Sequence, residues 1–276
     1  MTMWLASTFP VWLLGIILVA SGIVVGAGGA LLFRQRASGE PTGEYNQVAT
    51  SVTGIVGSMY TLVLGFCVFL VWTGADGAGR NVDNEARQLQ RIYSSAIVFE
   101  QPARDSLRER IKTYVRAVIE NEWSSMASGR EGPRARDALL DLDSFLAEIR
   151  PQTEVEFAAY ALSMNALGEI TASRAARLLQ AQESLPATLW VILILGWIAL
   201  VSLTWLFRVE SAPLSAGMST AVAVAIGLVL LVVLAFNHPF TGDLRVDPGP
   251  FQALLQTIER SKIGRASCRE RVYVLV

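Results

Sequence analysis

The chain has 276 residues, of which 52% are hydrophobic, and its mean hydropathy is +0.42. These values are too apolar for an ordinary soluble domain and are typical of a protein that lies partly in lipid. The net charge of -1 leaves no basic surface of the kind that replaces counterions around phosphates, so composition argues against a nucleic-acid partner.

Four uncharged stretches are long enough to cross about 30 Å of hydrocarbon, which takes about 20 helical residues. They cover residues 11–33, 48–73, 189–207 and 217–236. A signal peptide is the alternative for the first, but that run is too long and no basic residue precedes it. We therefore expect two membrane helices within 1–73 and two more within 188–236, with the lipid bilayer as a partner.

Small residues follow a helical spacing in the first two stretches. Gly22 and Gly26 match a small-xxx-small packing motif. In the second stretch one helix face carries small or hydroxylated residues, namely Gly54, Ser58, Thr61 and Gly65. This face fits close helix packing or the lining of a pore. A transporter is a third interpretation, but no ionisable residue lies within the spans to couple ions.

Residues 74–187 form the polar part of the chain and hold 14 Lys/Arg and 17 Asp/Glu. Their apolar residues follow the helical period, with no strand-like alternation, which predicts an extramembrane bundle of amphipathic helices. We expect these helices at 82–99, 107–123, 134–149 and from Thr153 towards Pro186. The simplest connection continues the second and third spans out of the bilayer as long helices.

The bundle offers no catalytic constellation, because neither a nucleophile with a base nor a phosphate-binding glycine loop is present. The acidic residues near Glu120–Glu122 and Asp141–Asp143 fall on polar helix faces, so we expect them to be solvated. His238 is the only histidine, which argues against a transition-metal site. We therefore expect no enzyme activity and no cofactor.

The segment 237–261 follows the fourth span and reads as a helix stop near the membrane. Asn237 and Pro239 end the helix, Gly242 turns the chain, and Asp247 begins a new helix. Alternatively, this segment lies under a pore mouth, with His238 and Arg245 near permeating ions. Residues 262–276 begin KIGRASCRERV, which resembles a translated sequencing adapter, so we expect them to be an artefact.

Five motifs give the chain a family resemblance: GSMYTLVLGFCVFLVW, NVDNEARQL, YVRAVIENEWSSM, LPATLW and NHPFTGDLRVDPGPF. Across about 44–255 the chain resembles the bacterial bestrophin-like family, also catalogued as DUF4239. Its VLGFCVFLVW run resembles the second membrane helix of bestrophins, which are pentameric anion channels. The resemblance implies a multi-pass protein of the inner (cytoplasmic) membrane that assembles with itself, as a pentamer, and conducts small inorganic ions such as chloride.

The resemblance also implies which residues narrow the pore. Bestrophins use apolar side chains at i, i+4 and i+8 of the second helix, and these positions correspond here to Ser58, Leu62 and Phe66. Ser58 departs from the pattern and implies a wetter constriction. The bestrophin calcium cluster is missing, because Asp243 and Asp247 alone supply too few oxygens. A non-conducting oligomeric scaffold or sensor that acts through its bundle is the alternative function.

The expected fold is therefore all-α. It is an integral membrane protein with four transmembrane helices and an extramembrane helical bundle inserted between the second and the third.

Overall fold

The structure is a computed structural model that describes residues 9–36, 43–207, 209 and 211–260. These residues contain helices and no strand, which confirms the predicted all-α class. Four helical stretches are long and apolar enough to cross a membrane, as predicted: Val11–Arg36, Gly43–Val98, Ala187–Thr204 and Ala212–Phe236. The predicted artefact at 262–276 lies outside the described residues.

The chain divides into two compact units. Unit 1 comprises Met1–Ala75 and Ser184–Arg245, and unit 2 comprises Asp76–Glu183 and Val246–Val276. Unit 1 therefore holds the four spans, and unit 2 holds the polar bundle together with the described residues after Arg245. The predicted segment 237–261 is divided between the two units after Arg245.

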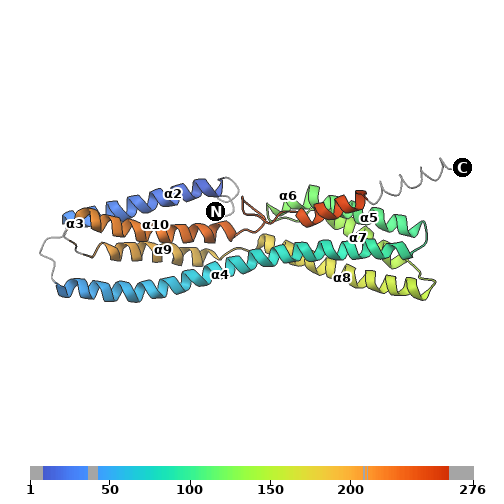
Figure 1. The fold of residues 1–276 in the computed structure, drawn as a ribbon, viewed down its shortest axis with the longest axis horizontal. Helices are drawn as coiled ribbons and strands as arrows, with labels where there is room; N and C mark the ends of the chain where they lie inside the picture. The colour runs from blue at the N-terminus through green and yellow to red at the C-terminus, as the bar shows by residue number, and fades with distance from the viewer. Residues whose placement is uncertain (1–8, 37–42, 208, 210, 261–276) are drawn as a thin grey trace. The chain divides into compact units, whose positions relative to one another are not determined.

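The first span of unit 1 packs closely along the fourth. It consists of α2 (Val11–Ile23), one π-helical turn η1 (Val24–Gly28) and α3 (Gly29–Arg36), and it lies beside α10 (Ala212–Phe236) (Figure 1). A Cβ atom on Gly26 would lie 2.7 Å from Thr220 Cα. The small-xxx-small motif therefore serves helix packing within the chain, as predicted.

The second span is part of α4 (Gly43–Ser95), and the third span is α9 (Ala187–Thr204). One face of α4 packs against α9 and α10 (Figure 1). Tyr60 is buried and donates a hydrogen bond of 2.9 Å to the backbone oxygen of Leu193. Gly196 leaves room for the Tyr60 ring, because a Cβ there would lie 2.4 Å from ring carbons. The buried cluster of unit 1 comprises Tyr60, Leu64, Cys67, Val71, Leu193, Leu200, Leu230 and Val233.

The two expected continuations of membrane helices have different outcomes. α4 is unbroken from Gly43 to Ser95, so the predicted extension of the second span is confirmed. The predicted extension of the third span is wrong, since α8 ends at Gln182 and α9 begins at Ala187. The reason is Pro186, which lacks a backbone N–H and biases the preceding residue away from helical geometry.

Unit 2 contains the predicted amphipathic helices. After the 3₁₀ turn η2 (Ala96–Val98) come α5 (Ala103–Ala117), the π-helical turn η3 (Val118–Glu122), α6 (Trp123–Met126), α7 (Pro133–Glu148) and α8 (Glu154–Gln182). A capping box of Thr153 and Glu156 begins α8. A further helix over 249–260 packs on this bundle, where Phe251 and Ile258 are fully buried.

The turn after α10 follows the prediction from sequence. α10 ends at Phe236, with Asn237 as its C-cap residue. Gly242 has a φ of 84°, a conformation that favours glycine. The Asp247 carboxylate then accepts a hydrogen bond from the backbone N–H of Gly249, where the 249–260 helix begins.

Candidate pore face of α4 and the buried charge network

The residues predicted to narrow a pore share the exposed side of α4 in unit 1. Leu62 is 75% exposed and Phe66 is 60% exposed. Ser58 is also exposed, and its hydroxyl donates a 2.9 Å hydrogen bond to the backbone oxygen of Ile55. By helical period this face lies opposite the buried side chains of Tyr60, Leu64, Cys67 and Val71. It is therefore uncovered within the single chain.

The neighbouring small-residue face of α4 is uncovered as well. Gly54, Thr61 and Gly65 are exposed, and a Cβ on either glycine would meet no atom within 4 Å. Packing within the chain therefore does not require these glycines, in contrast to Gly26 and Gly196. The two predicted faces lie side by side and share Ser58.

His238 and Arg245, the predicted pore-mouth residues, lie in different surroundings. His238 is only 7% exposed, and its Nε2 lies 3.2 Å from the side-chain nitrogen of Asn237. Asn237 in turn accepts a 2.8 Å hydrogen bond from the backbone N–H of Leu185. Burial lowers the pKa of His238, so its neutral form is favoured. Arg245 is exposed, in contrast to His238.

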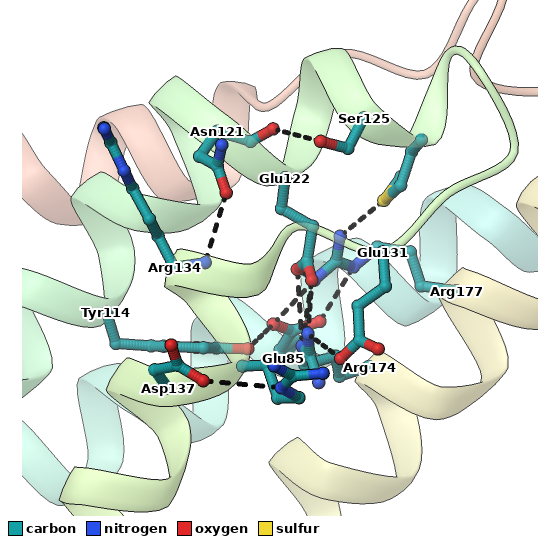
Figure 2. A network of polar contacts seen from close by, with 12 residues as sticks. Glu85, Tyr114, Asn121, Glu122, Ser125, Glu131, Arg134, Asp137, Arg174 and Arg177 are labelled. Carbon is teal, nitrogen blue, oxygen red and sulfur yellow. Dashed lines mark hydrogen bonds and ion pairs between the residues drawn. The ribbon is translucent and has the colours of Figure 1, made fainter.

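Unit 2 contains a buried network of ion pairs that joins three helical elements (Figure 2). Glu85 on α4, Glu122 in η3 and Arg177 on α8 are each 0% exposed. Arg177 Nε lies 2.9 Å from Glu85 Oε2, and its second terminal nitrogen lies 2.8 Å from Glu122 Oε2. Arg174 on α8 pairs with Glu122 and with Glu131. The two buried carboxylates therefore face two buried guanidinium groups.

Aromatic side chains enclose this network. The Tyr114 hydroxyl donates a 2.6 Å hydrogen bond to Glu85. The Arg177 guanidinium carbon lies 5.5 Å from the ring centre of Trp123 and 5.8 Å from that of Phe251, distances typical of cation–π contacts. Since Phe251 belongs to the 249–260 helix, the network also connects this helix to the bundle.

The surroundings of Arg177 favour its charged form. Burial alone would lower the pKa of Arg177, but the carboxylates of Glu85 and Glu122 outweigh it and raise that pKa. Burial and the Glu85 carboxylate raise the pKa of Tyr114 well above its usual value. Each carboxylate is held by donors, so the arrangement suits a structural connection better than acid–base chemistry.

The predicted solvation of the acidic residues is partly wrong. Glu120, Asp141 and Asp143 are exposed as predicted, whereas Glu122 is fully buried. It is buried because it follows Ile111, Val115 and Val118 on the apolar side of its helix, where Arg174 and Arg177 meet it. The helical period of the sequence did not predict the burial of Glu85, Arg174 and Arg177. Within the described ranges, no group of three His, Cys, Asp or Glu side chains could hold a metal ion.

Comparison with known proteins gives one family match and several fold matches. The Bestrophin-like domain family matches residues 21–251. A bacterial bestrophin homologue from Klebsiella pneumoniae, solved as a point variant, is 14% identical with a TM-score of 0.64, over 89% of this chain and 98% of that one. A second variant of that homologue gives 13% and 0.65, over 91% and 98%. A structure described only as a membrane protein gives 15% and 0.62, over 89% and 96%. No curated protein matches the chain.

Proposed function

This chain belongs to the bestrophin-like family, and we propose that it assembles with copies of itself into a passive, anion-preferring ion channel lined by α4. The observation that carries the proposal is the uncharged face of α4 with Ser58, Leu62 and Phe66, which lies opposite the buried face and is uncovered in the single chain. A symmetric ring of copies would turn this face towards its axis.

The chemistry of this face suits passage of weakly bound ions. A hydroxyl at Ser58 keeps one level of the pore wet, while Leu62 and Phe66 form an apolar constriction of the kind that gates by dewetting. The membrane-spanning part of α4 carries no Asp, Glu, Lys, Arg or His between Val48 and Thr73. A pore with these properties does not couple ions tightly, which favours a channel over a pump.

The family resemblance adds the finer features of the proposal. We place the protein in the cytoplasmic membrane as a homo-pentamer, with chloride among the small inorganic anions that it conducts. The adjacent face with Gly54, Thr61 and Gly65 would then pack against a neighbouring copy, since no part of the described chain covers it.

Ion flux across liposomes that contain the purified oligomer tests the proposal. We expect chloride flux above that of empty liposomes, and we expect the paired substitutions Leu62→Ala and Phe66→Ala to raise conductance or weaken selectivity, because they widen the constriction. Val63→Ala and Leu70→Ala remove apolar side chains from exposed positions of α4 that lie outside the helical register of Leu62 and Phe66, and they serve as a comparison. Flux that the Leu62/Phe66 variant leaves unchanged would contradict the pore assignment. No flux from a folded oligomer would instead support a scaffold or sensor.

A further inference from the structure

The exposed face of α4 changes character beyond the membrane span. In unit 2 the buried side of α4 carries Ala78, Val82, Glu85, Leu89 and Ile92. Its opposite side is exposed and carries Asp76, Arg80, Asp83, Arg87 and Arg91. Because α4 is one unbroken helix, the position of these charges relative to Leu62 can be followed along the helical period.

The charged positions continue the register of the proposed pore face. From Leu62 the steps to Phe66, Phe69, Thr73, Asp76 and Arg80 alternate between four and three residues, and the same alternation leads on to Arg87. This spacing keeps residues on one side of a helix. The proposed pore face is therefore neutral within the span and charged beyond it.

The charge on this extension is unbalanced. Arg80 pairs with Asp76 at 2.7 Å, although both side chains are more than half exposed, and such exposed pairs are weak. Arg91 donates to the neutral side chain of Gln88 at 3.2 Å. Arg87 forms no ion pair with any residue that the structure describes. Three arginines against two aspartates leave one positive charge per chain on this face.

Several cations elsewhere in unit 2 form ion pairs with carboxylates. Arg110 pairs with Asp141 at 3.1 Å, and Arg116 pairs with Glu259 at 2.9 Å. Arg174 and Arg177 pair with buried glutamates. The whole chain carries a net charge of -1. The exposed face of α4 in unit 2 therefore carries a net charge opposite in sign to that of the whole chain.

We propose that Arg80, Arg87 and Arg91 form an anion-attracting stripe on α4 that concentrates small inorganic anions at the extramembrane end of the pore. The proposal rests on the channel function above and names the residues that set its preference for anions. Each copy in a ring adds one positive charge around the axis, and rings of arginine favour anions over cations. The stripe acts through long-range attraction and does not hold an ion tightly.

Reversal potentials across potassium chloride gradients test the stripe in the full-chain oligomer. The variant neutralises Arg80, Arg87 and Arg91 to Gln. The control neutralises Arg130, Arg134 and Arg136 to Gln, which removes the same charge from exposed positions away from α4. We expect the permeability of chloride relative to potassium to fall about threefold or more at about 20 mM salt in the first variant only. At about 500 mM the difference should nearly vanish, because screening shortens the reach of the charges to a few ångströms.

Charge reversal at a single position gives a second measurement. Arg87→Glu changes a stripe residue that forms no ion pair among the described residues, so it should lower the chloride preference further than Arg87→Gln. Equal selectivity of wild type and the stripe variant at low salt would contradict the proposed role of the stripe. In that case, flux that still changes with Leu62→Ala and Phe66→Ala would continue to support the channel function. Equal losses in the control would also contradict the proposed role of the stripe. Absence of flux in the wild type would overturn the channel function and the stripe with it.

Discussion

The buried charges of unit 2 illustrate how individual residues hold the bundle together. A carboxylate with no exposed surface, such as that of Glu122, is stable only when its desolvation is offset by close partners. Arg174 and Arg177 supply these partners from α8, while Tyr114 and Arg177 do the same for Glu85. Each partner depends on the others, so the loss of one leaves an unbalanced charge in a dry environment.

Glu122→Gln should therefore destabilise the protein strongly. The amide keeps the shape of the side chain but removes the negative charge that faces Arg174 and Arg177. The expected cost is about 3–5 kcal/mol, the range for breaking a buried ion pair, measured as a lower thermal unfolding midpoint of the detergent-solubilised protein. Glu120→Gln, two residues earlier and exposed, should change stability by no more than about 0.5 kcal/mol. Equal midpoints for Glu122→Gln and wild type would show that the network does not contribute as described.

The sequence contained a signal for these buried charges, but it was ambiguous. Arg174 and Arg177 follow Ile170 at spacings of four and seven residues, and Glu85 follows Val82 and precedes Leu89 on the same side of α4. A charge in an apolar register predicts a buried ion pair only when the opposing helix is known. The pairing between segments about 90 residues apart could not be predicted from periodicity, so only the structure identifies it.

At the scale of whole helices, contact between elements depends on where glycines lie. Gly26 brings η1 against the backbone of α10, and Gly196 accommodates Tyr60 from α4. Gly54 and Gly65 on α4 face open space instead. The sequence predicted that Gly22 and Gly26 serve helix packing, but it could not assign a role to the α4 glycines. Glycines at helix contacts and glycines that face open space occur at similar helical spacings.

Gly26→Ala and Gly28→Ala should have opposite consequences although they lie in the same turn. A methyl group on Gly26 would come within 2.7–2.9 Å of backbone atoms of Thr220 and Ser219, which cannot move aside independently. We expect a loss of about 1–3 kcal/mol, typical of overpacking. A methyl group on Gly28 meets nothing within 4 Å, so that variant should be as stable as wild type or slightly more stable. Thermal unfolding of both variants checks this, and equal destabilisation would contradict the close approach of η1 to α10.

At the scale of the molecule, hydropathy alone predicted the number of spans and the polar insertion between the second and the third. It could not predict which spans continue as helices beyond the membrane. Seven consecutive residues from Thr73 to Gly79 look like a linker and yet are helical within α4. One face of the helix stays buried through this stretch, at Val71 before it, Ala78 within it and Val82 after it. Pro186 has the opposite effect and separates α8 from α9. Backbone chemistry decides the second case, whereas tertiary packing decides the first.

Four spans also fix which segments share a side of the membrane, and this can be measured without knowing the function. One span, α9, lies between the bundle and Ser211, and a second, α10, lies between Ser211 and the 249–260 helix. Single cysteines at Ser128, Ser211 and Thr257, all exposed, should therefore react differently with a membrane-impermeant thiol reagent. The background carries Cys268→Ser and keeps Cys67, which is 1% exposed. We expect Ser128→Cys and Thr257→Cys to be labelled from one side and Ser211→Cys only from the other.

Labelling of all three from one side would mean that α9 and α10 do not cross the bilayer. If Thr257→Cys were labelled from the same side as Ser211→Cys and Ser128→Cys from the other, α9 would cross the bilayer and α10 would not.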